Sequence, residues 1–312
     1  MHPFAFVFPG QGSQSVGMLD AWGDHPAVRR TLDAAADALG QDVGKLIREG
    51  PKEALELTTN TQPVMLSAAI ACLEAWRAEG GPEPAAVAGH SLGEYSALVA
   101  AGAMTLADAL PLVRLRAEAM QRAVPVGAGA MAAILGLDAD KVGAICAEVA
   151  AATGAVVAPA NFNDPLQTVI AGAKAAVDAA CDRLKAAGAK RALPLPVSAP
   201  FHCALMAPAA EELRAHLAAV RIGTPRIPVV NNIDVATPGA PDAIRDALYR
   251  QAFGPVRWVE CVQRLKALGA MHIVECGPGK VLAGLVKRVD GEITTTTVLD
   301  PASLAEAKGM LQ

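Results

Sequence analysis

The chain has 312 residues, of which 53% are hydrophobic and 4% aromatic, and it carries a formal net charge of −4. It is long enough for one large α/β domain, or for a large domain with a smaller insert. It contains neither a basic block nor a patch of interleaved basic and aromatic residues, and this argues against nucleic acid as a partner.

The six cysteines are dispersed and show no metal-binding or redox spacing. They are therefore predicted to be reduced, mostly buried thiols of a cytoplasmic protein, and we expect no metal and no cofactor. The first residues lack the basic region of a signal peptide. No run of about 18 apolar residues is free of charges and helix breakers, so no membrane span is predicted.

Residues 4–8 predict a buried strand, which is followed by a tight, glycine-rich loop around Gln11. Loops at the carboxyl ends of strands are where α/β folds usually bind ligands. The loop lacks the third glycine of a dinucleotide-binding fingerprint, so that function is rejected. Helical periodicity then covers residues 27–39 and 62–79.

The stretch 85–96 predicts a short strand, a tight turn that holds Ser91, and the start of an alanine-rich helix. Gly89 and Gly93 bracket the serine as Gly-x-Ser-x-Gly. Such a turn strains the serine backbone and exposes the hydroxyl, and it needs small neighbours because other chain segments pass close by. The backbone N–H groups of the following helix start point to the same place and can hold negative charge. Ser91 is thus the candidate nucleophile.

A helix is predicted from a capping signal at residues 105–108 to about residue 124. Arg116 falls in the middle of its apolar arc. A guanidinium cannot lose its proton, so a buried Arg116 requires an anion. The alternative is an arginine that reaches outward or pairs with a structural carboxylate, but no carboxylate lies on the same arc of the helix.

From residue 126 the pattern changes. Strands are predicted at 129–135, 156–160, 167–171 and 191–195, with helices at 139–151 and 174–187. The order β-α-β-β-α-β is typical of a ferredoxin-like unit. We therefore expect a small inserted domain at 126–197. Residues 1–125 and 198–312 would form a discontinuous, large α/β-hydrolase-like domain with a mainly parallel sheet.

After the insert, the pattern predicts a helix that ends at residue 219, strands at 228–234 and 272–276, and helices at 242–251, 258–268 and 281–289. A serine nucleophile needs a base within hydrogen-bond reach. Of the six histidines, His202 is the best candidate, because it lies where a loop meets a helix start. The order of residues differs from that of ordinary α/β-hydrolases, and no aspartate stands out as a third member. A Ser-His pair fits better, with the second ring nitrogen held by a backbone carbonyl or an amide side chain.

The stretch Gly89-His90-Ser91-Leu92-Gly93-Glu94-Tyr95-Ser96 resembles the active-site signature of malonyl-CoA:acyl carrier protein transacylases. These share their family with the acyltransferase domains of fatty-acid and polyketide synthases. Arg116 lies 25 residues past the serine, as it does in this family. Further segments resemble family motifs in the expected order along the whole chain: Phe8-Pro9-Gly10-Gln11-Gly12-Ser13-Gln14, Thr61-Gln62-Pro63, Asn161-Phe162-Asn163, Pro200-Phe201-His202-Cys203, Val230-Asn231-Asn232 and Gly277-Pro278-Gly279-Lys280-Val281-Leu282.

The resemblance implies a ping-pong acyl transfer that supplies fatty-acid biosynthesis. His202 would take the proton of Ser91, which attacks the thioester of malonyl-CoA, and the malonyl group would then pass to the phosphopantetheine thiol of acyl carrier protein. Arg116 would hold the malonyl carboxylate. The remaining roles implied by the family are an oxyanion hole at the N–H groups of Gln11 and Leu92, substrate contacts from Gln62, Phe201, Asn161 and Asn163, and a backbone carbonyl at Gln251 that orients the histidine.

We expect a monomer. We also expect a preference for malonyl over methylmalonyl groups, because Phe201 would crowd an α-methyl, but no absolute exclusion, since one methyl is worth only about 1–3 kcal/mol in such a pocket. Three alternatives remain at this point. The chain could be a serine esterase or thioesterase, a stand-alone acyltransferase of a polyketide or malonate decarboxylase pathway, or a catalytically silent module that binds acyl carrier protein.

Overall fold

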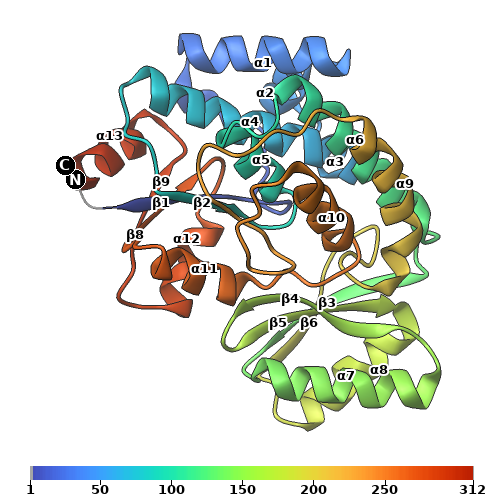
Figure 1. Cartoon of the computed structure of the whole chain (residues 1–312). Coiled ribbons are helices and arrows are strands. Elements are labelled where there is room, and N and C mark those ends of the chain that lie inside the picture. Colours follow the sequence, from blue (N-terminus) through green and yellow to red (C-terminus); the bar gives the residue numbers. More distant parts are fainter. Residues whose placement is uncertain (1–2, 312) are drawn as a thin grey trace.

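A five-stranded parallel sheet lies at the centre of the computed structural model, which describes residues 3–311 (Figure 1). The strand order is β7-β2-β1-β8-β9, and the strands span Phe4–Phe8 (β1), Ala86–Gly89 (β2), Val229–Val230 (β7), His272–Cys276 (β8) and Thr294–Val298 (β9). In the pairing of β1 with β2, Phe8 lies opposite Gly89. The two loops that follow these strands therefore lie side by side at the carboxyl edge of the sheet.

The central strand β1 is buried on both faces, and its residues alternate between two cores. Phe4, Phe6 and Phe8 point to one face, where the Phe6 ring lies edge-on to Trp76 with the ring centroids 5.4 Å apart. Ala5 and Val7 point to the other face. Figure 1 shows helices on both sides of the sheet, as a sheet buried on both faces requires.

The face that carries the phenylalanines is covered by most of the helices. These are α1 (Pro26–Leu39), α2 (Val43–Glu49), α3 (Lys52–Glu56), α4 (Thr58–Ala78), α5 (Gly93–Ala100), α6 (Leu106–Ala123), α9 (Ala207–Ala219), α10 (Pro241–Gln251) and α13 (Pro301–Leu311), with the 3-10 turns η1 (Asp20–Trp22) and η2 (Ala204–Met206). The opposite face packs against α11 (Trp258–Ala267) and α12 (Val281–Val289).

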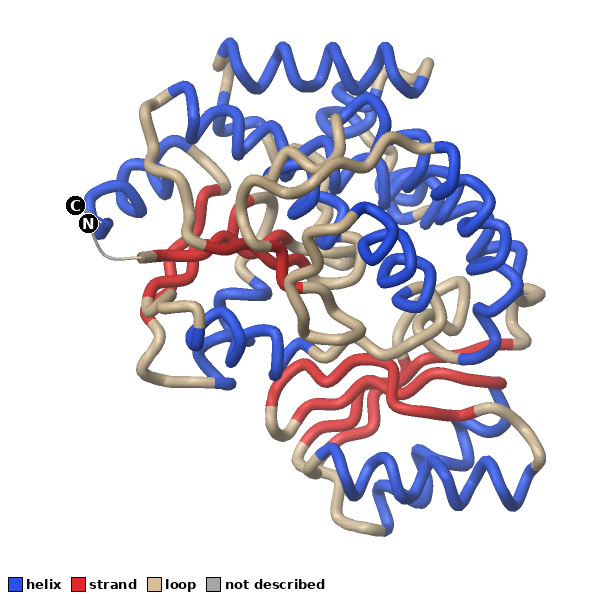
Figure 2. Tube along the Cα trace, in the orientation of Figure 1, coloured by secondary structure: helices blue, strands red, loops and turns tan. Residues whose placement is uncertain are grey.

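A second, antiparallel sheet forms from the middle of the chain, in the order β4-β5-β3-β6 (Figure 2). Its elements are β3 (Gly129–Leu135), α7 (Ala139–Thr153), β4 (Val157–Asp164), β5 (Gln167–Ala173), α8 (Lys174–Ala186) and β6 (Arg191–Pro194). The two helices cover its outer face with their own apolar core. The inner face contributes Met131 and Ala160 to a small cluster that includes Cys203 and packs against Phe201.

Two contacts tie the second sheet to the rest of the chain. Within β4, Asn161 forms an isolated parallel bridge with Val256. Val256 N–H donates to the Ala160 carbonyl at 2.8 Å, and the Val256 carbonyl accepts from Phe162 N–H at 2.9 Å. Arg288 on α12 pairs with Asp164 at 2.6 Å. These contacts fix the end of β4 near the carboxyl edge of the parallel sheet.

The predicted fold class is confirmed: a mainly parallel α/β sheet accompanies a β-α-β-β-α-β unit with an antiparallel sheet. The bounds predicted for β3, β8 and α12 match those observed. The strand predicted at 228–234 is wrong in length, since β7 holds two residues. The Asn231 side-chain oxygen accepts from the N–H groups of Asp234 and Ala236, which turns the chain out of the sheet. No prediction covers α2, α3, β9 or α13.

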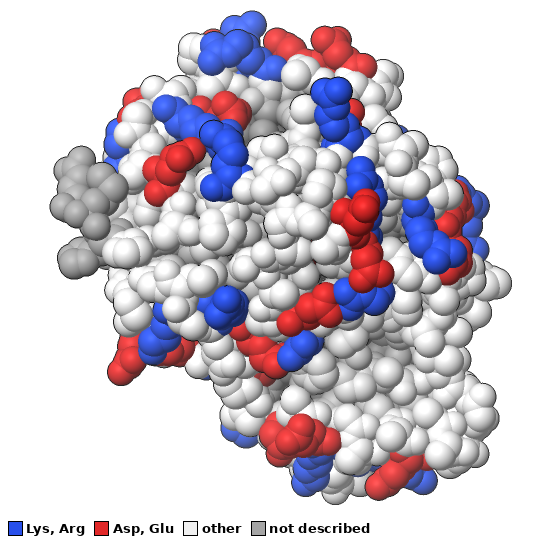
Figure 3. All heavy atoms as spheres, viewed as in Figure 1, with Lys and Arg blue, Asp and Glu red and all other residues white. Residues whose placement is uncertain are grey.

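Lysines and arginines are interspersed with aspartates and glutamates in scattered groups on the visible face, and much of its middle is uncharged (Figure 3). Within residues 3–311, no helix is both long and apolar enough to span a bilayer, and no cluster of three or more possible metal ligands forms. All six cysteines are free and buried.

Candidate active site

The turn that carries Ser91 joins β2 to α5, as the sequence pattern predicts. Ser91 adopts a positive φ of 53°, which non-glycine residues rarely do. A Cβ at Gly89 would lie 1.9 Å from the backbone of Gly93, and one at Gly93 would lie 2.1 Å from the Phe8 carbonyl oxygen. The chain therefore tolerates no side chain at either glycine, and this close packing holds the serine in its strained conformation.

His202 lies against the serine. Its Nε2 is 2.6 Å from Ser91 Oγ, and its Nδ1 lies 3.0 Å from the carbonyl oxygen of Gln251 and 3.2 Å from that of Gly254. Two carbonyl acceptors require a proton on Nδ1, so Nε2 is left as the acceptor for the serine hydroxyl. His202, like Ser91, has a positive φ, here 60°. The arrangement is a Ser-His pair oriented by backbone carbonyls.

Burial and, after it, the neighbouring Arg116 charge together lower the pKa of the His202 imidazole to about 3. The histidine is only 4% exposed. It is therefore neutral at ordinary pH, which is the state that a general base needs before it accepts a proton.

Arg116 reaches the same point from α6. Its two terminal nitrogens donate to Gln62 Oε1 at 2.8 Å, to Ser91 Oγ at 3.1 Å and to Gln251 Oε1 at 3.1 Å. The residue is 2% exposed, and its Nε has no hydrogen-bond partner among residues 3–311. Burial lowers the pKa of Arg116, yet a guanidinium keeps its proton. A buried cation whose three acceptors are all neutral is suited to receive an anion beside the serine.

The N–H groups of Gln11 and Leu92 donate no hydrogen bond to any residue in the described part of the chain. Leu92 directly follows the serine at the start of α5, and Gln11 follows the neighbouring strand β1. Both residues line the hollow that contains Ser91. Two free amides at adjacent loops, next to a helix N-terminus, are suited to stabilise an oxyanion.

The hollow around Ser91 has a volume of about 500 Å³ and is lined by residues from both parts of the chain. The parallel part contributes Gln62, Arg116 and His202, whereas Met131 and Asn161 come from the antiparallel sheet and Phe201 from the segment between them. Asn163 does not line this hollow: its Oδ1 lies 2.8 Å from Nε2 of the half-buried His90, which does line it. The other predicted site residues are brought together.

Three residues that support the serine turn or His202 are not among the predicted site residues. Glu94 is 2% exposed, Asn232 is fully buried, and both bond to the serine turn or its supports. Gly254 supplies the second carbonyl to His202. Asn232 belongs to the Val230-Asn231-Asn232 motif and Glu94 to the signature around Ser91, so both carried a sequence signal, whereas Gly254 carried none.

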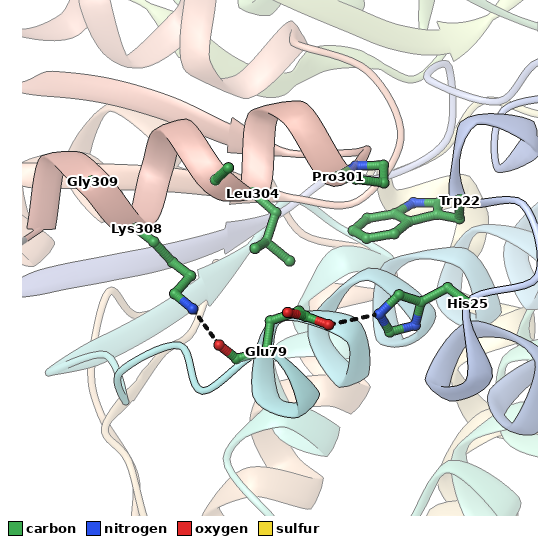
Figure 4. A pocket seen from close by; sticks show the side chains of 8 residues that line it. Trp22, His25, Glu79, Pro301, Leu304, Lys308 and Gly309 are labelled. Atoms are coloured by element: carbon green, nitrogen blue, oxygen red, sulfur yellow. Dashed lines mark hydrogen bonds and ion pairs between the residues drawn. The ribbon is translucent and has the colours of Figure 1, made fainter.

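A second hollow of about 530 Å³ lies between η1, α4 and α13 (Figure 4). Figure 4 shows Trp22 and Leu304 on its walls, with His25 3.4 Å from the Glu79 carboxylate and Lys308 bonded to the Glu79 carbonyl. Volume alone does not distinguish the two hollows. No serine or cysteine lies beside a base here, so the hollow at Ser91 is the candidate active site.

A hydroxyl with a neutral base, free amides and a buried cation around it is suited to acyl transfer. The chain belongs to the acyl transferase family, whose domain matches residues 5–299. It is 53% identical over 308 residues to the malonyl CoA-acyl carrier protein transacylase of Escherichia coli strain K12, with 98% of this chain and 99% of that protein covered. The same enzyme of Bacillus subtilis strain 168 is 47% identical over 97% of this chain and 96% of its own.

Solved structures agree with this assignment. The acyl-carrier-protein S-malonyltransferase of Burkholderia pseudomallei 1710b superposes with a TM-score of 0.97 at 64% identity, covering 98% of this chain and 99% of that chain. The malonyl-transacylase PlMCAT, solved in complex with the holo form of the type II PKS acyl-carrier protein AntF, gives a TM-score of 0.96 at 50% identity and covers 99% of both chains.

Proposed function

We propose that this protein transfers the malonyl group of malonyl-CoA to the phosphopantetheine thiol of acyl carrier protein, for fatty-acid biosynthesis. One observation carries the proposal: Ser91 Oγ lies 2.6 Å from a neutral histidine nitrogen and 3.1 Å from a buried guanidinium. The first contact suits a nucleophile, and the second suits a carboxylate attached to the acyl group. The relatives that carry this activity by name match 97–98% of the chain.

In the first half-reaction, Ser91 Oγ attacks the thioester carbonyl while His202 Nε2 takes the hydroxyl proton. The N–H groups of Gln11 and Leu92 hold the resulting oxyanion. When the tetrahedral intermediate collapses, the C–S bond breaks and the CoA sulfur leaves with the proton from His202. The product is a malonyl ester on Ser91, and His202 is again neutral.

The second half-reaction runs the same steps toward a new thiol. His202 takes the proton of the phosphopantetheine thiol, whose sulfur attacks the ester carbonyl. The bond between the acyl carbon and Ser91 Oγ then breaks, and Oγ regains its proton from the histidine. Because one base serves both halves, CoA and the carrier arm occupy the same approach to Ser91 in turn.

Arg116 holds the malonyl carboxylate with its two terminal nitrogens. The carboxylate adds a charged acceptor beside the neutral ones, and because Arg116 is only 2% exposed, the electrostatic gain is larger than at a surface. Gln62 fixes the guanidinium plane from α4, and Asn161 and Phe201 line the acyl pocket. Asn163 contributes indirectly by holding His90 next to the serine. Gln251 orients His202 through its backbone carbonyl.

The two separate apolar cores support a further proposal on organisation. Residues 126–197 form an inserted domain, and 1–125 with 198–312 form the discontinuous catalytic domain. We also propose that the enzyme acts in the cytoplasm, as a monomer, without a cofactor. Six buried, free thiols support the reducing compartment.

Release of CoA from malonyl-CoA, followed with and without holo-acyl carrier protein, tests the function. Without a carrier we expect one rapid equivalent of CoA per enzyme, as Ser91 is acylated, and then only slow release by hydrolysis; fast steady-state release should require the holo-carrier. Apo-carrier, which lacks the thiol, is the matched control and should not accept the group. Release at the same rate without a carrier would identify a thioesterase instead and would reject the transferase proposal.

A further inference from the structure

A buried carboxylate lies directly behind the proposed nucleophile. Glu94 is in the first turn of α5, three residues after Ser91, and is 2% exposed. One of its oxygens, Oε2, accepts two hydrogen bonds: from the backbone N–H of Asn232 at 2.8 Å and from Nε2 of Gln251 at 3.0 Å. The donors belong to the segment after β7 and to the last residue of α10. One oxygen thus joins three segments that are distant in sequence.

Both partners of Glu94 hold the backbone of Ser91. Asn232 Oδ1 accepts from Ser91 N–H at 2.7 Å, and Asn232 Nδ2 donates to the Gly89 carbonyl at 2.7 Å. Gln251 Nε2 donates to the Ser91 carbonyl at 3.0 Å. Because Ser91 has a positive φ, its conformation persists only where the surroundings hold it. These two amide side chains hold both polar groups of its backbone.

Glu94 also sets the direction of the Gln251 amide. Nε2 faces two acceptors, Glu94 Oε2 and the Ser91 carbonyl, so Oε1 must face the other way, toward Arg116. The backbone carbonyl of the same glutamine accepts from His202 Nδ1. A reversed amide would place its NH2 group against the guanidinium.

We propose that Glu94 is a positioning residue: its Oε2 holds Asn232 and Gln251, and through them it fixes the strained Ser91 backbone, the His202 imidazole and the Arg116 guanidinium. The role is that of a hydrogen-bond acceptor at a fixed reach. Glu94 makes no hydrogen bond to Arg116, whose donors go to Gln62, Ser91 and Gln251. Burial raises the pKa of Glu94 to about 7, which agrees with a role that does not need the charge.

Two substitutions separate reach from charge. Glu94→Gln keeps an oxygen at the same distance and removes the charge. Glu94→Asp keeps the charge but withdraws the oxygens by about one C–C bond, roughly 1.5 Å. The readout is the single-turnover rate at which malonyl-CoA acylates Ser91, followed by intact mass. A misplaced nucleophile loses roughly 100-fold per ångström, so we expect Glu94→Asp to be slower by about 30- to 100-fold and Glu94→Gln to stay within about threefold.

Glu275 offers a matched control. It is also fully buried, burial raises its pKa to about 7 as well, and its Oε2 accepts from Ala283 N–H at the start of α12, outside the active site. Glu275→Asp should lower the thermal unfolding midpoint about as much as Glu94→Asp, but it should leave the acylation rate of the folded protein within about threefold. A loss at Glu94 alone then reflects positioning and not general stability.

This inference rests on the proposed function only for the choice of acyl donor. The rate at which a fluorophosphonate probe labels Ser91 measures the reactivity of the Ser-His pair without a thioester. The labelling rates should follow the same order, with Glu94→Gln close to the wild type and Glu94→Asp slower. A wild-type protein that reacts with the probe but not with malonyl-CoA would reject the proposed function and leave the positioning test intact.

An active Glu94→Asp with an inactive, folded Glu94→Gln would show that the charge matters, and it would overturn the proposal. Equal rates for the wild type and both variants would overturn it as well. If Glu94→Asp does not fold, Glu94→Gln decides: a folded, slow Glu94→Gln contradicts an acceptor role, and a fast one supports it.

Discussion

The two sheets contribute to the same hollow in different ways. The parallel sheet brings Ser91, Gln11 and the Asn232 segment together because its strands all end at one edge. The antiparallel sheet offers part of a wall, with Met131 and Asn161 on its inner face. Reactive geometry therefore depends on strand ends and strained turns in one sheet, while the other sheet supplies shape. Substitutions should differ in size and kind between the two regions.

The largest effect is expected at the parallel sheet. Ser91→Ala removes the attacking oxygen and leaves the turn intact, since alanine is smaller than serine. Acyl transfer should fall by at least roughly 10⁴-fold, as it does when a covalent nucleophile is removed. The check is the rate of malonyl transfer together with the thermal unfolding midpoint. A folded variant that retains the activity would mean that another residue forms the acyl-enzyme.

Arg116→Ala should have the next largest effect, and it should depend on the substrate. Loss of a buried partner of a charged group typically costs about 2–5 kcal/mol, so malonyl transfer should drop about 30-fold or more. Acetyl-CoA has no carboxylate, and its much slower transfer should be spared in relative terms. The ratio of kcat/KM for the two donors measures this, and an equal fall for both would assign Arg116 a structural role.

Asn161→Ala in the antiparallel sheet should cost less, about tenfold or below. The Asn161 side chain makes no hydrogen bond to other residues in the part of the chain that the structure describes, so its removal should not disturb the Ser-His pair. We expect a higher KM with little change in kcat, as for binding that is equal in the ground and transition states. A loss in kcat comparable to that of Arg116→Ala would remove the distinction between the two sheets.

The smallest change is expected in the pH profile. Because burial and then Arg116 lower the pKa of His202 to about 3, the acylation kcat/KM should not fall through protonation of this base between pH 6.5 and 5. Stability, unlike this rate, should change with pH. Below pH 6.5 the unfolded chain binds a proton at His202 that the folded chain does not, so the free energy of unfolding decreases as pH falls. In Arg116→Ala the pH at which kcat/KM falls through protonation of His202 should be higher than in the wild type. An unchanged pH would contradict the electrostatic effect of Arg116 on His202.

The residues that could be predicted are those with a local signal. Ser91 lies between two glycines, Arg116 lies on an apolar helical arc, and the small sheet follows from clean strand and helix periods. The supports of the site could not be predicted in this way. Asn232 and Gln251 meet the serine turn from 141 and 160 residues away, and no sequence period reports such contacts.

Two strands differ from the prediction, one for a local reason and one for a tertiary reason. The strand at β7 is cut short by the side chain of Asn231, which bonds its own downstream backbone. The strand β9, Thr294–Val298, consists of four threonines and one valine, so it lacks the apolar run that identifies a buried strand. Tertiary pairing with β8 determines this element.

The central claim is that malonyl-CoA leaves its acyl group on Ser91 and that the ester is then passed on. Intact-mass spectrometry of the full chain after a brief exposure to malonyl-CoA, followed by a chase with holo-acyl carrier protein, tests it most directly. We predict a single malonyl adduct that maps to Ser91, persists in buffer, disappears on the chase and reappears on the carrier. An adduct that never forms, that maps to another residue, or that is lost to water as fast as to the carrier would contradict the account.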